Sequence, residues 1–109
     1  MSYFCGEPGA PEQGSGHVSY DLLTQANGCV NGCIAGISDY TETEYGDSGC
    51  HEDQEGFYVV SGTGWAKVGN EEKRIAAGDA FFVPPGVAHT MKAECRDTLL
   101  RVFWFHASV

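Results

Sequence analysis

The sequence lacks the long apolar segments that mark membrane-inserted and secreted proteins. Its 109 residues contain no apolar run of the roughly 18 residues that a transmembrane helix needs. The N-terminus, MSYFCGEPGAPEQ, has neither the basic start nor the apolar stretch of a secretory signal. We therefore expect no membrane span and no signal peptide, and a cytoplasmic location is the default expectation.

Positive charge is also scarce. Six Lys and Arg residues stand against 15 Asp and Glu residues, so the formal net charge is -9. A field of this sign repels a phosphate backbone and an anionic lipid surface. No segment resembles a helix-turn-helix either, so we expect neither nucleic acid nor a membrane as a partner.

Helical periodicity is hard to find anywhere in the chain. The sequence holds 15 glycines and 12% aromatic residues, with many β-branched residues and short polar connections. This composition favours an all-β sandwich or barrel, and the length predicts one domain. Residues 1–16 predict an irregular arm, and residues 17–24 predict a first strand in which His17 is an exposed strand-end residue.

The cysteines form an odd set in a chain that shows no secretory signal. This pattern predicts reduced thiols with no special task rather than a disulfide framework. The CVNGC segment is a lone pair without a nearby histidine, which argues against a structural zinc site. The five cysteines are Cys5, Cys29, Cys33, Cys50 and Cys95.

One stretch, GDSGCHEDQEGFYVVSG at residues 46–62, contains an imidazole and a carboxylate close to each other in the sequence. His51 and Glu55 are four positions apart, which in a straight strand is roughly 13 Å and too far to share one ion. The polar segment EDQ between them is long enough for a tight hairpin. Such a hairpin would set His51 at the end of one strand opposite Glu55 at the start of the next.

Alternating apolar residues predict the strand that follows Glu55. Phe57 and Val59 share a face with the carboxylate, and Tyr58 and Val60 lie on the other face. Both faces are therefore apolar, which suits a strand covered on both sides or one at a subunit interface. Further strands are predicted at 33–41, 65–68, 73–76 and 80–83, the second and third joined as a hairpin around GNEE.

The segment PPG before His89 predicts a stiff loop, because proline fixes φ and cannot donate to a sheet. A histidine held by a rigid turn loses little entropy on binding a metal. The last strand is predicted at 98–105, where Arg101 marks the outer face and parity points His106 inward. The inward residues of that strand are Leu100, Val102 and Trp104.

Two spaced motifs carry a family resemblance. Three residues separate His51 from Glu55, and six separate Glu55 from Gly62. Further along, Gly78 is followed by DAFFV, PPG, VA and His89. The sequence thus resembles the cupins, small β-barrels in which two such motifs build a metal site.

The resemblance implies an all-β fold of the cupin type, a double-stranded β-helix or jelly-roll barrel. It implies a barrel at 31–109, on which an N-terminal arm and first strand at 1–30 pack within one structural domain. Of the three histidines and one glutamate of the usual site, this chain keeps His51, Glu55 and His89. Gly49 stands where the first motif histidine would be, and Ala93 replaces the final asparagine.

The three remaining ligands form a set that suits one divalent metal ion, Fe, Mn, Zn or Ni, with positions left open for water, substrate or dioxygen. The alternative is a degenerate site whose residues are ordinary polar groups of the barrel interior. Cys50 reaches the site only through a bulge, and His106 is a candidate for an extra ligand or a supporting residue. Residues expected to wall a pocket are Gly49, Phe57, Val59, Phe82, Val102 and Trp104.

Two classes of function stay open at this point. The first is a metal-dependent enzyme acting on a small molecule, an oxygenase, isomerase or lyase. The second is a non-catalytic module that binds a small molecule or senses it. In both cases we expect a homodimer, because strand 57–60 is apolar on both faces and because cupins commonly pair.

Overall fold

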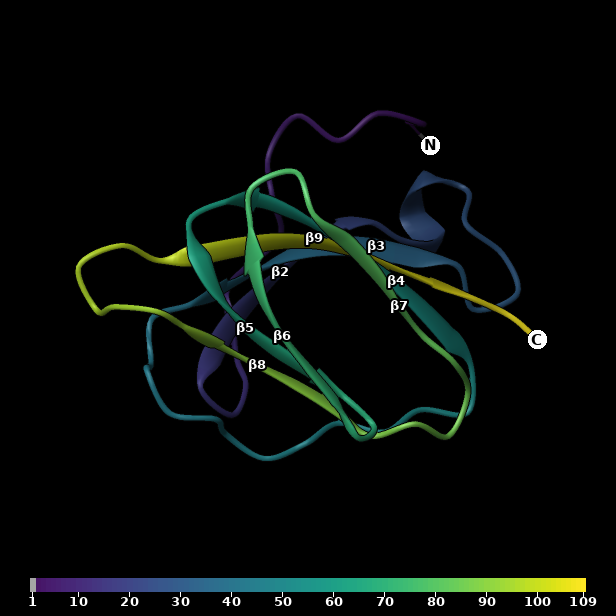
Figure 1. Cartoon of the computed structure of the whole chain (residues 1–109). Helices are drawn as coiled ribbons and strands as arrows, with labels where there is room; N and C mark the ends of the chain where they lie inside the picture. Colours follow the sequence, from purple (N-terminus) through teal and green to yellow (C-terminus); the bar gives the residue numbers. More distant parts are fainter. Residues whose placement is uncertain (1) are drawn as a thin grey trace.

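The computed structural model describes residues 2–109 and confirms the all-β class (Figure 1). Within these residues the chain forms nine strands and one short 3-10 turn. The elements are β1 (Glu12–Gln13), β2 (His17–Leu23), η1 (Gln25–Asn27), β3 (Ile34–Tyr40), β4 (Gln54–Ser61), β5 (Thr63–Val68), β6 (Glu71–Ala76), β7 (Ala80–Val83), β8 (His89–Ala93) and β9 (Leu100–Ala107). No helix in residues 2–109 is long and apolar enough to cross a bilayer.

The strands form two antiparallel sheets. The larger sheet has the order β1-β2-β3-β9-β4-β7 and the smaller one the order β6-β5-β8. The N-terminal strands join the edge of the larger sheet through β3, so the predicted arm at 1–16 is not wholly irregular. Both sheets send buried side chains into one core, which is the jelly-roll arrangement.

The core follows the alternation predicted for β4 and β9. Val59, Val102 and Leu100 are fully buried, and Val59 lies directly opposite Val102 in the antiparallel pair. Each such side chain contributes about 1.5–3 kcal/mol by leaving water. On the opposite face Arg101 donates from Nε and Nη2 to the Asp39 carboxylate at 2.7 and 2.8 Å, as expected of a residue on the outer face.

The predicted hairpin is formed by β5 and β6, but its turn is tighter than the four residues GNEE. Val68 pairs with Glu71, so only Gly69 and Asn70 make the turn. Gly69 has φ of +58°, a backbone region that glycine enters without steric cost. The hairpin places Ala66 and Ile75 in the core.

Strand β8 was not predicted. It begins at His89, where the sequence indicated only the end of a stiff loop, and it pairs with β5 through Lys67 and Thr90. Its Met91 and Ala93 are buried. The strand is short and its partner lies more than twenty residues upstream, so local alternation carried little signal. All five cysteines are free thiols in the part of the chain that the structure describes.

Candidate metal site

Glu55 is the centre of the site. It is the second residue of β4, between His106 of β9 and Val83 of β7 in the sheet register. Its side chain points inward from the same strand face as Phe57, and the residue is 6% exposed. A carboxylate this deeply buried is costly unless it is paired or coordinates a cation.

His51 reaches Glu55 by a route that differs from the predicted hairpin. The chain bends at Glu52 and Asp53 before β4, but His51 ends no strand that pairs with β4. Instead, the loop is held by the PPG turn between β7 and β8, because Gly86 N–H donates to the His51 carbonyl at 2.7 Å. The hairpin prediction is therefore wrong: the PPG turn supports His51 as well as leading to His89.

His89 is the first residue of β8 and is 8% exposed. Its backbone exchanges two hydrogen bonds with Gly49, at 2.8 and 2.9 Å. Its ring Nδ1 lies 3.4 Å from the Val87 carbonyl, which can only accept, so this contact directs Nε2 toward the site. Burial lowers the pKa of His89, but the nearby Glu55 carboxylate and the Val87 carbonyl outweigh burial, so the pKa is raised.

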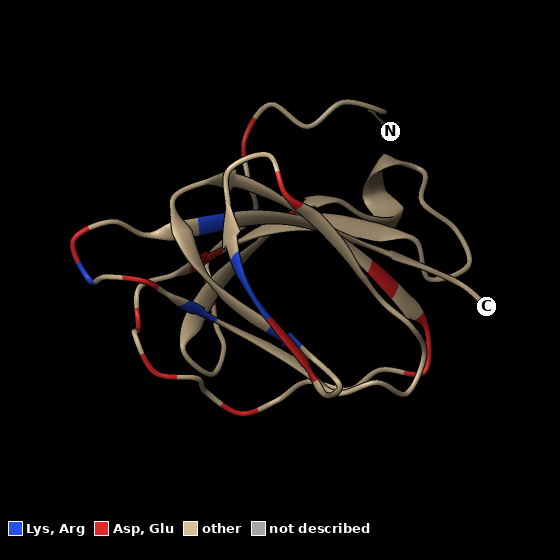
Figure 2. Ribbon diagram, viewed as in Figure 1, with Lys and Arg blue, Asp and Glu red and all other residues tan. Residues whose placement is uncertain are grey.

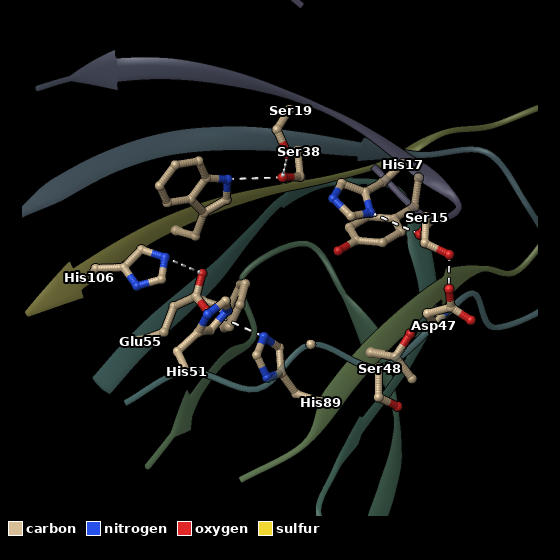
Figure 3. A pocket seen from close by; sticks show the side chains of 15 residues that line it. Ser15, His17, Ser19, Ser38, Asp47, Ser48, His51, Glu55, His89 and His106 are labelled. Carbon is tan, nitrogen blue, oxygen red and sulfur yellow. Dashed lines mark hydrogen bonds and ion pairs between the residues drawn. The ribbon is translucent and has the colours of Figure 1, made fainter. Parts of the chain in front are cut away.

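Two imidazoles, those of His51 and His89, face one oxygen of Glu55 (Figure 3). Oε1 lies 3.5 Å from His51 Nε2 and 3.3 Å from His89 Nε2. The ligand atoms of His51, Glu55 and His89 all lie within 4.8 Å of one another. Among residues 2–109, Oε1 is buried and has no hydrogen-bond partner. Leaving such an atom unpaired costs free energy, and a cation between the three atoms would satisfy it, so the residues fit a metal.

Gly49 borders the same space. A Cβ built at this position would lie 3.4 Å from the His89 ring and 3.7 Å from His51 Nε2. Position 49 therefore faces the site, and the absent side chain leaves room between the two imidazoles.

The ligand atoms open into a cavity of about 380 Å³ (Figure 3). Phe57 and Trp104 supply apolar wall, and the far end is polar. Trp104 Nε1 donates to Ser38 Oγ at 2.9 Å, which fixes the indole against the wall. Among the described residues no Lys or Arg lines the cavity.

Sequence comparison decides the family. The family model described as the cupin domain matches residues 40–106. The chain belongs to the cupin family. Comparison with curated protein sequences finds no match.

Several solved structures share the fold of this cupin. An RmlC-like cupin from Shewanella frigidimarina is 25% identical with a TM-score of 0.78, over 100% of this chain and 93% of that one. A predicted oxalate decarboxylase from Thermotoga maritima is 19% identical with a TM-score of 0.80, over 100% of both chains. Fe(II)-HppE with the alternative substrate (S)-1-HPP is 15% identical with a TM-score of 0.76, over 98% of this chain and 60% of that one.

Some residues expected in the cupin pocket lie elsewhere. Val59 and Val102 are fully buried in the core and do not border the cavity. Phe82 is 48% exposed on the outer face of the larger sheet, because the parity of β7 turns it away from the interior. Cys50 is exposed and does not border the cavity, as expected of a residue one position from His51.

Other residues expected near the site do border the cavity, namely Gly49, Phe57, Trp104 and His106. His106 lies inward, as parity predicts, with Nε2 3.1 Å from Glu55 Oε2. It is outside the group of three whose ligand atoms converge. The structure therefore brings His51, Glu55 and His89 together and places His106 behind the carboxylate.

The sequence did not reveal the polar far end of the cavity. His17 was expected on the exposed end of a strand, but it borders the cavity and its ring lies on Tyr40, with centroids 4.8 Å apart. Tyr40 is 7% exposed, and burial together with the charge of Glu55 raises its pKa. Ser38 and Tyr40 lie two positions apart on β3 and therefore face the same side of the sheet. This alternation could have predicted that both face the cavity if the pairing of β3 with β9 had been known.

Proposed function

We propose that this cupin binds one divalent metal ion, Fe, Mn, Zn or Ni, through His51, Glu55 and His89, and acts on a small molecule in the adjoining cavity. The observation that carries the proposal is the Glu55 oxygen. It is buried without a hydrogen-bond partner among the described residues and faces two imidazole nitrogens. Two imidazoles and one carboxylate leave other coordination positions free for a ligand.

Such an ion, when bound, supplies Lewis-acid chemistry or a site for dioxygen. The residues of the chain supply the rest. Phe57 and Trp104 exclude water from one side of the cavity. Tyr40 keeps its proton because its pKa is raised, so its hydroxyl can donate a hydrogen bond to an oxygen of the small molecule.

Similar structures support a metal-dependent reaction. One is described as Fe(II)-HppE with an alternative substrate and another as a predicted oxalate decarboxylase. Their identity to this chain is below the level at which function transfers, since one fold hosts many chemistries. Experiment must therefore decide whether the reaction is that of an oxygenase, an isomerase or a lyase.

Metal analysis of the purified protein tests the proposal. We expect about one ion per chain, and we expect Glu55→Gln and His51→Ala to lose it because each removes one of three ligands. Cys50→Ser is the matched control: the residue adjoins His51 but is exposed and outside the cavity, so this variant keeps the metal. A wild-type protein without stoichiometric metal, unchanged by His51→Ala, would contradict the proposal.

The second candidate function is a non-catalytic binding or sensor module. Gly49 favours it, because the site has three ligands where the cupin motif provides four. Oxygen uptake with Fe(II) and candidate substrates separates the two functions. Uptake coupled to loss of a substrate supports the enzyme, whereas metal-dependent binding without turnover supports the module.

A further inference from the structure

His106 and Glu55 are direct neighbours across two strands. The antiparallel register of β4 and β9 pairs them, so their side chains project from the same face of the sheet. His106 Nε2 lies 3.1 Å from Glu55 Oε2. The side chain of His106 is 16% exposed, so water screens this contact little.

Asp53 holds the other side of the same ring. His106 Nδ1 lies 3.1 Å from Asp53 Oδ1 and 3.0 Å from Oδ2 (Figure 3 shows His106 beside Glu55). Asp53 stands in the bend just before β4, two residues from Glu55. Each nitrogen of the imidazole faces a carboxylate, that of Asp53 on one side and that of Glu55 on the other. The ring is therefore fixed at both ends.

Because of this contact, the two oxygens of the Glu55 carboxylate face different partners. Oε2 faces His106, while Oε1 is left facing His51 and His89. Without a partner for Oε2, the carboxylate could rotate about its last torsion, which is broad and roughly two-fold. Fixing that torsion presents one oxygen to the metal position.

We propose that His106, held by Asp53, is a positioning residue that orients Glu55 for metal binding and is not itself a ligand. The inference rests on the proposed metal-binding function. It agrees with the convergence of only three ligand atoms among the described residues. Residues that orient metal ligands change metal affinity by about 10- to 100-fold when they are replaced.

Two substitutions of different length separate the contacts of His106. In His106→Gln the amide nitrogen can reach the place of Nε2 and donate to Glu55. In His106→Asn the shorter side chain reaches only the place of Nδ1, beside Asp53. Mn²⁺ titrated into the metal-free protein and followed by calorimetry should bind His106→Gln within about threefold of wild type and His106→Asn about 10- to 100-fold more weakly.

Controls distinguish the two levels of the proposal. Thermal unfolding without metal checks that each variant folds, and the visible spectrum of the Co²⁺ form reports the ligand set. A wild-type spectrum in His106→Gln supports positioning. A changed spectrum, or a loss of affinity in His106→Gln equal to that in His51→Ala, would make His106 a ligand and overturn the inference.

Two further outcomes also count against it. Unchanged Mn²⁺ affinity in His106→Asn would leave the metal-binding function standing and overturn only the positioning role. A wild-type protein that binds neither Mn²⁺ nor Co²⁺ would overturn both.

Discussion

At the scale of single residues, two positions define the site more than their neighbours do. Glu55 gathers three histidines around one carboxylate. Gly49 leaves open the space beside two of them. Glu55 favours a bound cation, because a buried carboxylate needs a charged partner. Gly49 limits the number of metal ligands that the chain offers, because it has no side chain.

His89 makes metal binding depend on pH. Burial lowers its pKa, but the adjacent Glu55 carboxylate and Val87 carbonyl raise it by more, and a metal binds only the neutral imidazole. We expect the affinity for Zn²⁺ to rise with pH through a midpoint above about 6.5. Calorimetry at several pH values between about 6 and 8 measures it, and an affinity independent of pH in this range would contradict the prediction.

The metal-free protein should show the opposite trend. A histidine with a raised folded-state pKa stabilises the fold fully below its unfolded pKa, and this contribution is lost as pH rises through the folded value. We therefore expect the contribution of His89 to the free energy of unfolding to fall over the pH range in which Zn²⁺ affinity rises. The measure is the difference between wild type and His89→Asn in urea, and a difference that grows with pH would contradict this prediction.

Replacing Gly49 with histidine should add a fourth metal ligand. Its φ lies outside the left-handed range, and a Cβ there meets the two histidines only at ordinary contact distance. We expect Gly49→His to tighten metal binding by about tenfold, the scale on which changes around a metal act. Gly49→Ala is the matched control, since it fills the same space without a nitrogen. Equal affinity in both variants would show that position 49 cannot reach the metal.

At the scale of elements, strands β4 and β9 could be predicted from the sequence and the loop before β4 could not. Alternation along Phe57 to Val59 and along Leu100 to Trp104 predicted the inward faces, because side chains alternate across a strand, but a register shift after Val59 leaves Ser61 exposed instead of on the face of Glu55. The path of His51 depends on a backbone contact with Gly86. Such nonlocal pairings leave no local pattern, and β8 and the His17 end of the cavity escaped prediction for the same reason.

Adjacent leucines at the start of β9 test this alternation. Leu100 is fully buried and Leu99 is 38% exposed. We expect Leu100→Ala to lower the free energy of unfolding by about 2–5 kcal/mol through lost burial and a cavity. Leu99→Ala should change it by less than about 1 kcal/mol. Urea denaturation measures both, and equal effects would contradict the assigned faces.

At the scale of the whole molecule, an apolar patch lies on the outer face of the larger sheet over β4, β7 and the end of β9. Tyr58, Val60, Phe82 and Phe105 are each between 43% and 49% exposed. Phe105 and Phe82 flank Gly56 in the register, and a Cβ at Gly56 would overlap the Phe105 ring. Within the described strands, β7 and the outward residues of β4 carry no charged side chain, while acidic residues lie mainly elsewhere (Figure 2).

This face predicts pairing of two copies of the chain. Burying the aromatic residues favours association, whereas a net charge of -9 on each copy opposes it. We therefore expect a dimer at micromolar concentration that is strengthened by salt, since salt screens the repulsion. Phe82→Asp should give a monomer by placing a charge in the buried face, whereas Val109→Asp, at an 83% exposed position, should not. Sedimentation measures all three proteins, and a monomeric wild type at every salt concentration would contradict the pairing.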